Sequence, residues 1–110
     1  MTNPALPEIY GHLDADIAPL VHALRSAGFP TSCSGGSDRK DSWLNVPFVN
    51  IAADGKGPLA VGIMRVMAAR WLRERGITAN VCEVWTTLQD EPEFPFVRVE
   101  IFSDLSEARF

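Results

Sequence analysis

A run of small polar residues and glycines is the part of this sequence that offers the most chemistry. It reads Thr31-Ser32-Cys33-Ser34-Gly35-Gly36-Ser37. Glycines let a backbone take positive φ and approach a ligand closely. Successive amides in such a turn, with serine hydroxyls beside them, can form a concave nest for an anion. The run therefore predicts an anion-binding loop, and the alternative is a plain turn rich in serine and glycine.

Two larger side chains follow the run and complete the predicted site. Arg39 suits phosphate or carboxylate, because a guanidinium donates paired hydrogen bonds in one plane; an arginine of the second predicted helix is the alternative. Trp43 lies where no periodic pattern requires a large apolar group, so we expect it to stack on a base or to cap a pocket. The predicted ligand-binding residues are Ser32, Cys33, Ser34, Gly35, Gly36, Ser37, Arg39 and Trp43.

Other chemistries fit the sequence less well. The glycines are not a P-loop, because no Gly-Lys-Ser/Thr follows them. Neither the cysteines, Cys33 and Cys82, nor the histidines, His12 and His22, have zinc-ligand spacing. Cys33 as a nucleophile with a histidine base is an alternative, but a buried inert thiol is the more common situation. We expect no metal, no cofactor and no catalytic residue.

Composition limits the class of protein. The chain has 110 residues, of which 46% are hydrophobic and 22% charged, which suits one folded domain over residues 1–110. Its net charge of −4 argues against a dedicated nucleic-acid binder, although eight of the ten bases are arginines. Two cysteines are too few for a disulfide framework, and no apolar run suits a membrane span or a signal peptide. The expected location is the cytoplasm.

Hydrophobic periodicity predicts two helices and several strands that position the site. Ile17, Leu20, Val21 and Leu24 share one helical face, with Asp14 or Asp16 as cap, Pro19 in the first turn and Gly28 after the end. The second helix starts near Pro58 and stops at Gly76, and its wide apolar face comprises Ala60, Ile63, Met64, Met67, Ala68, Trp71 and Leu72. The predicted helices are 16–27 and 58–75, and the clearest strands are 46–53, 78–88 and 96–102.

The sequence also matches itself at a shift of 48 residues. The matched positions are Leu24-Arg25 with Leu72-Arg73, Gly28 with Gly76, Phe29 with Ile77, Pro47-Phe48-Val49 with Pro95-Phe96-Val97, and Ile51 with Val99. The match predicts an α+β fold made of a duplicated αββ-αββ unit, with repeats at about 14–54 and 62–102. A four-stranded, mainly antiparallel sheet with both helices on one face is the expected assembly.

Around the serine-glycine run the chain resembles a known family. Asp14-Ala15-Asp16-Ile17 followed by Thr31-Ser32-Cys33-Ser34-Gly35 is similar to the start of the wybutosine-synthesis tRNA methyltransferases, which carry a Thr-Ser-Ser-Cys-Ser-Gly-Arg signature. Short phage and bacterial proteins have a similar loop. The resemblance covers about 25 residues and implies a shared scaffold with a site at this loop. It does not imply methyl transfer, because Gly36 stands where the family has arginine.

One face of the sheet is left without helices in this arrangement. Alternation along the last strand gives two sets, Val97/Val99/Ile101 and Phe96/Arg98/Glu100/Phe102, and the second is assigned outward because it mixes aromatic and ionic groups. Trp85 on the neighbouring strand is placed with it. Exposed aromatic rings on this face predict a homodimer, with Arg98 and Glu100 paired across a two-fold axis. The alternative reverses the two faces.

Taken together, these patterns favour a small, non-enzymatic binding module. It would hold an anionic small molecule such as a nucleotide, or a sequestered nucleotide signal if the protein were of phage origin. Two alternatives stay open: a reduced relative of the tRNA methyltransferases, and a protein-interaction module that uses the open face of the sheet.

Overall fold

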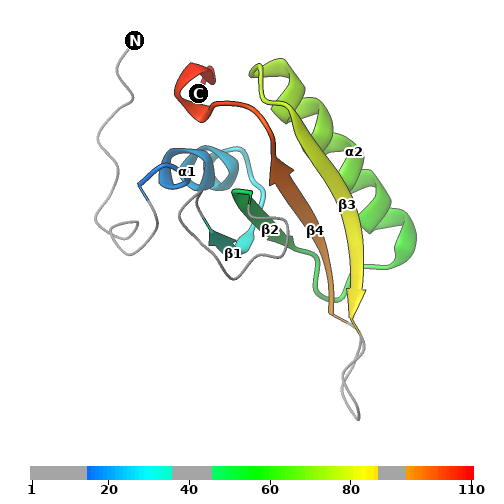
Figure 1. The fold of residues 1–110 in the computed structure, drawn as a ribbon. Helices are drawn as coiled ribbons and strands as arrows, with labels where there is room; N and C mark the ends of the chain where they lie inside the picture. The colour runs from blue at the N-terminus through cyan, green and yellow to red at the C-terminus, as the bar shows by residue number, and fades with distance from the viewer. Residues whose placement is uncertain (1–14, 36–45, 87–93) are drawn as a thin grey trace.

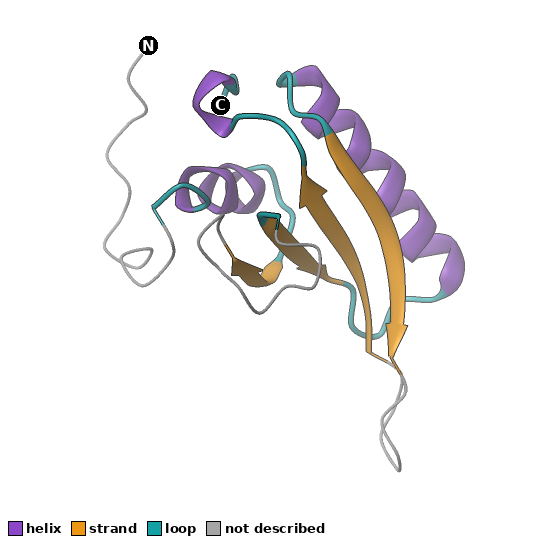
Figure 2. Cartoon of the chain, viewed as in Figure 1, coloured by secondary structure: helices purple, strands orange, loops and turns teal. Residues whose placement is uncertain are grey.

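The computed structural model describes residues 15–35, 46–86 and 94–110. Along this part of the chain the elements are α1 (Ala18–Ser26), β1 (Thr31–Gly35), β2 (Phe48–Ala52), α2 (Pro58–Glu74), β3 (Ala79–Thr86), β4 (Phe94–Ile101) and the 3₁₀ turn η2 (Leu105–Glu107). The strands pair antiparallel in the spatial order β1-β2-β4-β3 (Figure 1). The α+β class with an antiparallel sheet is therefore confirmed (Figure 2).

The core lies between the two helices and one face of the sheet. Alternate residues of β2 and β4 on that face are buried, namely Val49, Ile51, Val97, Val99 and Ile101. They form one cluster with residues of both helices, among them Leu20, Leu24, Val61, Ala68 and Leu72. The valine and isoleucine set of the last strand therefore faces the core, as the sequence predicted, and the reversed assignment is wrong.

Both helices end in the same backbone arrangement. After α1, Gly28 has φ of +95°, and the Phe29 N–H donates to the Leu24 carbonyl at 2.9 Å. The end of α2 repeats this with Gly76 at φ of +73° and an equivalent hydrogen bond of 3.0 Å. A bond that spans five residues past a left-handed glycine is the Schellman ending. Both predicted helix stops are confirmed.

Alanine at either of these glycines is expected to cost at least about 1 kcal/mol, because L residues are strained at positive φ. An added Cβ at Gly28 or Gly76 would meet no atom within 4 Å, so the cost is purely conformational. The matched control is Gly62→Ala inside α2, which has equal space and is expected to gain about 0.5–1 kcal/mol from helix propensity. Urea unfolding curves measure all three. Stabilisation by Gly28→Ala would contradict the assigned helix ending.

The buried face of α2 differs from the predicted one. Its fully buried residues are Val61, Ala68 and Leu72, while Met64 and Trp71 are partly buried against the core. Ile63 and Met67, which the sequence placed on the buried face, are exposed. A helix lying on a sheet buries a stripe narrower than the apolar arc of this sequence, so periodicity alone selected residues on its outer side.

The start of α1 also differs in detail. Ile17 occupies the cap position and makes no side-chain capping bond, so Asp16 is not the cap, while Pro19 does lie in the first turn. Asp14, the other predicted cap, lies outside the described residues. In the described ranges no helix is both long and apolar enough to cross a membrane.

Candidate functional site

Half of the predicted ligand-binding residues lie in a strand. Ser32, Cys33, Ser34 and Gly35 belong to β1, which pairs with β2 with an irregularity between residues 31 and 33. Among glycines of the described residues, positive φ occurs at positions 28, 55 and 76. The expected nest is therefore not formed up to Gly35, because backbone pairing with β2 extends these residues. The other predicted residues, Gly36, Ser37, Arg39 and Trp43, lie outside the described residues, as does His12.

An arginine of α1 contacts the beginning of β1. Arg25 donates from Nε to Thr31 Oγ1 at 2.6 Å and from Nη2 to the Thr31 carbonyl at 3.2 Å. The two residues line a depression of about 420 Å³ together with residues 28–30. Sequence reasoning missed Arg25. Its position in the last turn, just before the Gly28 reversal, was the available signal.

Two arginines of α2 pair with residues outside β1. Helix α2 lies along β3, which is at the opposite end of the strand order from β1 (Figure 1). Arg65 pairs with Glu83 of β3 at 3.3 Å, and Arg70 pairs with Glu74 at 3.0 Å. The guanidinium of Arg75, the residue after α2, lies over the ring of Trp71. The alternative of an α2 arginine at the serine-glycine site stays a prediction, because residues 36–45 lie outside the described part of the chain.

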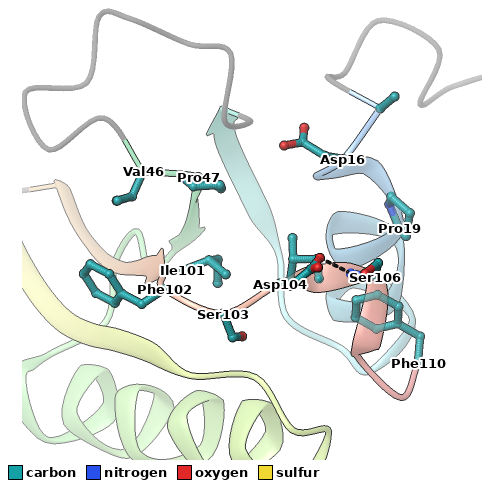
Figure 3. A pocket seen from close by; sticks show the side chains of 12 residues that line it. Asp16, Pro19, Val46, Pro47, Ile101, Phe102, Ser103, Asp104, Ser106 and Phe110 are labelled. Carbon is teal, nitrogen blue, oxygen red and sulfur yellow. Dashed lines mark hydrogen bonds between the residues drawn. The ribbon is translucent and has the colours of Figure 1, made fainter.

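A cavity of about 600 Å³ opens where β4 ends and β2 begins (Figure 3). Its wall combines the start of α1, the start of β2 and the C-terminal segment; the lining residues are Ala15, Asp16, Pro19, Val46, Pro47, Ile101, Phe102, Ser103, Asp104, Leu105, Ser106 and Phe110. Val46 directly follows segment 36–45 in the chain, and Gly35, which precedes that segment, pairs with Phe48. The residue after the segment that carries Arg39 and Trp43 thus lines the cavity, and the residue before it pairs with the first residue of β2.

The cavity wall is acidic and aromatic. Asp104 accepts a hydrogen bond from the Ser106 N–H at 2.9 Å, which lowers the pKa of Asp104 below its ordinary value. The carboxylate is therefore ionised at neutral pH, and Asp16 supplies a second acid. Phe102 and Phe110 stand at opposite sides of the cavity (Figure 3). Such a wall favours a flat group that donates hydrogen bonds. The same wall repels an anion.

A polar cluster occupies the sheet face opposite the helices. Glu100 is only 5% exposed, and its Oε1 accepts from Asn80 Nδ2 at 3.1 Å. Its Oε2 is 3.9 Å from Arg98 Nε, and the Arg98 guanidinium lies 4.3 Å above the ring centre of Phe48. Within the described part of the chain, Glu100 Oε2 and the buried Asn50 Oδ1 accept no hydrogen bond. The set Phe96/Arg98/Glu100/Phe102 is thus outward by alternation, but the side chain of Glu100 is buried.

Cys82 lies on the same face of the sheet as this polar cluster, opposite the helices. It lies opposite Arg98 in the pairing of β3 with β4 and forms no disulfide. Burial raises the pKa of the Cys82 thiol above its ordinary value; Glu100 adds to the rise and Arg98 opposes it. The thiol is therefore protonated at neutral pH and is a weak nucleophile. In residues 15–35, 46–86 and 94–110 no three His, Cys, Asp or Glu side chains gather as metal ligands.

Trp85 does not join the predicted aromatic surface. It pairs with Pro95, whereas Val84 pairs with Phe96. Directly paired residues share a face, so Trp85 lies on the helix-bearing side of β3. Phe96 is partly buried, and Phe102 lines the cavity. The placement of Trp85 with Phe96 and Phe102 on one open surface is wrong, because it depended on a strand register that alternation alone does not give.

Comparison of the chain with protein-family models, with curated proteins and with solved structures found no match. The resemblance to the wybutosine-synthesis methyltransferases stays a prediction.

Proposed function

We propose that the protein is a small non-enzymatic binding module for an anionic small molecule such as a nucleotide. The anionic end of the ligand would bind residues 32–37 and Arg39. Its uncharged end would enter the 600 Å³ cavity and stack on Trp43. The observation that carries the proposal is that Val46, the residue after segment 36–45, lines this cavity, while Gly35, the residue before the segment, pairs with Phe48 at the start of β2. Cavities that hold small ligands have volumes of about 300–1,000 Å³.

The charge of the cavity wall indicates which end of the ligand lies where. Asp16 and Asp104 would repel a phosphate inside the cavity. The anionic group of the ligand is therefore assigned to residues 32–37 and Arg39. The same carboxylates can accept hydrogen bonds from amino or hydroxyl groups, and Phe102 offers a ring for stacking. A nucleotide combines these features, because its phosphate, ribose hydroxyls and flat base lie in sequence along one molecule.

Calorimetric titration with nucleotides, nucleosides and inorganic phosphate is the direct test. We expect a nucleotide to bind more tightly than either of its parts. Arg39→Ala is expected to weaken nucleotide binding by about tenfold or more, because a hydrogen bond to a charged group contributes about 1.5–3 kcal/mol. Phe102→Ala is expected to weaken nucleotide and nucleoside alike. Met67→Ala, an exposed change on α2, is the matched control. Absence of binding by every member of the panel would overturn the proposal.

We further propose that the scaffold arose by internal duplication. Helices α1 and α2 end at Ser26 and Glu74, which correspond under the 48-residue shift, and both carry the same glycine ending. In the pairing of β2 with β4, Asn50 lies opposite Arg98, its own counterpart under that shift. A two-fold relation between the halves passes through this pair. The outer strands differ in register, and β1 carries an irregularity that β3 lacks.

Two expectations accompany the proposed function. The free thiol of Cys82 agrees with a reducing compartment, and we propose the cytoplasm as the place of action. The predicted homodimer is also kept as a proposal, but the aromatic surface assigned to it is not.

A further inference from the structure

Two buried oxygen atoms on the sheet face opposite the helices accept no hydrogen bond within the described part of the chain. They are Oε2 of Glu100 and Oδ1 of Asn50. A buried acceptor without a donor costs free energy, because the atom has lost its contact with water and has gained no partner. Such an atom in a folded protein calls for a specific explanation. A ligand that donates hydrogen bonds supplies one.

The polar neighbours of Glu100 leave its Oε2 without a donor. Asn80 Nδ2 donates to the other carboxylate oxygen, Oε1, at 3.1 Å. Arg98 Nε is 3.9 Å from Oε2, which is too long for a hydrogen bond, and the Arg98 guanidinium lies over the ring of Phe48. Glu100 is nevertheless only 5% exposed. Its second oxygen is therefore held in place and available to a donor from outside this cluster.

Glu100 and Asn50 lie diagonally across the pairing of β2 with β4. Phe48 is opposite Glu100, and Asn50 is opposite Arg98. Diagonal neighbours on one face of a sheet are about 7–8 Å apart, which is within reach of a long side chain such as glutamate. The two oxygens can therefore accept two hydrogen bonds from one flat group that carries two neighbouring donors.

The two acceptors lie beside the cavity that the proposed function assigns to the ligand. Phe102, which lines the cavity, follows Glu100 by two residues. The Phe102 N–H donates to the Thr78 carbonyl at 2.8 Å, so strand pairing continues as far as this residue. Residues two apart in a strand share one face and are about 7 Å apart along it. A base stacked on the Phe102 ring therefore has Glu100 within reach of its edge.

We propose that Glu100 and Asn50 recognise the base of the bound nucleotide and that this base is guanine. The inference rests on the proposed function. Guanine carries two neighbouring donors, the N1–H and the 2-amino group, which match the two acceptor oxygens. Adenine and cytosine each present one amino group beside a ring nitrogen that accepts, and this nitrogen would face an oxygen. A guanidinium has the same pair of donors but no base to stack on Phe102.

Calorimetric titration of the natural chain with the monophosphates of guanosine, inosine and adenosine tests the choice of base. We expect guanosine monophosphate to bind at least about tenfold more tightly than adenosine monophosphate, because a matched pair of hydrogen bonds discriminates between bases by this factor or more. Inosine monophosphate lacks the 2-amino group and is expected to fall between the two. Methylguanidine, a guanidinium without a base, is expected to bind much more weakly than guanosine monophosphate.

Glu100→Gln tests the residue assigned to the base. Because Asn80 donates to Oε1, the glutamine oxygen is expected to stay at that position and the new amide nitrogen to replace Oε2. A donor then stands where guanine needs an acceptor. We expect guanosine monophosphate to lose at least about tenfold in affinity and adenosine monophosphate to lose none. Glu83→Gln, a change on the helix-bearing side of β3, is the matched control and is expected to keep the preference for guanine.

Asn50→Leu is a second test that does not depend on the stability of Glu100→Gln. It removes a buried acceptor that has no donor, so the melting temperature is expected to stay equal or to rise while guanosine monophosphate binds severalfold more weakly. Equal affinity for the three nucleotides, methylguanidine binding as tight as that of guanosine monophosphate, or a guanine preference that survives in folded Glu100→Gln would overturn this inference alone. Absence of binding by every nucleotide would overturn the proposed function as well.

Discussion

Replacing Leu72 with alanine is expected to lower the free energy of unfolding by about 2–5 kcal/mol. Leu72 is 1% exposed in the core shared by both helices and the sheet, so truncation removes buried surface and leaves a cavity. Its carbonyl also accepts the Ile77 N–H that ends α2. Domains of this size have a total stability of about 5–15 kcal/mol, so the loss is a large fraction of the whole. Urea unfolding followed by circular dichroism measures it.

Leu59→Ala is the matched control for this prediction. It makes the same chemical change in the same helix at a side chain that is mostly exposed. Its effect on the free energy of unfolding is expected to stay within about 0.5 kcal/mol. Equal destabilisation by Leu59→Ala and Leu72→Ala would contradict the assigned orientation of α2 on the sheet.

Arg98→Met is expected to destabilise the protein by about 3 kcal/mol, because it leaves the buried carboxylate of Glu100 without a cation. The ion pair is long, at 3.9 Å, but within the described residues Arg98 is the one ion-pair partner of Glu100. The substitution also removes the contact of the guanidinium with the Phe48 ring, which contributes about 0.5–1 kcal/mol. Thermal and urea unfolding measure the sum.

The double variant Arg98→Met with Glu100→Leu distinguishes charge burial from lost packing. Replacing both partners of a buried ion pair with apolar side chains is often neutral or stabilising, so most of the lost stability is expected to return. Arg98→Lys keeps a cation and is expected to fall between the natural chain and Arg98→Met. If the double variant is less stable than Arg98→Met, the burial of Glu100 is not the cause.

The fold class and the positions of most helices and strands along the chain could be predicted, because local sequence patterns determine them. The alternation of Val97, Val99 and Ile101 identifies the core face of β4, and Gly28 and Gly76 mark helix ends whose conformation only glycine adopts easily. These signals depend on neighbours along the chain. The two helices and three of the strands follow from them, with ends shifted by a few residues.

Features that depend on tertiary contacts could not be predicted in the same way. Ser32 to Gly35 have low strand propensity and extend because β2 offers backbone partners. Which arc of α2 faces the sheet, and which face holds Trp85, follow from packing and register. The cavity forms where the C-terminal segment with Asp104 meets the starts of α1 and β2, which are far apart in sequence. No single segment carries that signal.

The most direct test of the proposed binding function is a two-dimensional amide NMR titration of the full chain with a nucleotide. We expect saturable shift changes that gather at Ser34 and Gly35, at Val46, and at Phe102 and Ser103, where the strand end and the cavity wall meet. Amides of the exposed α2 residues Leu59, Ile63, Val66 and Met67 are expected to stay unchanged. Shift changes confined to α2, or none at all with any nucleotide, would contradict the proposal.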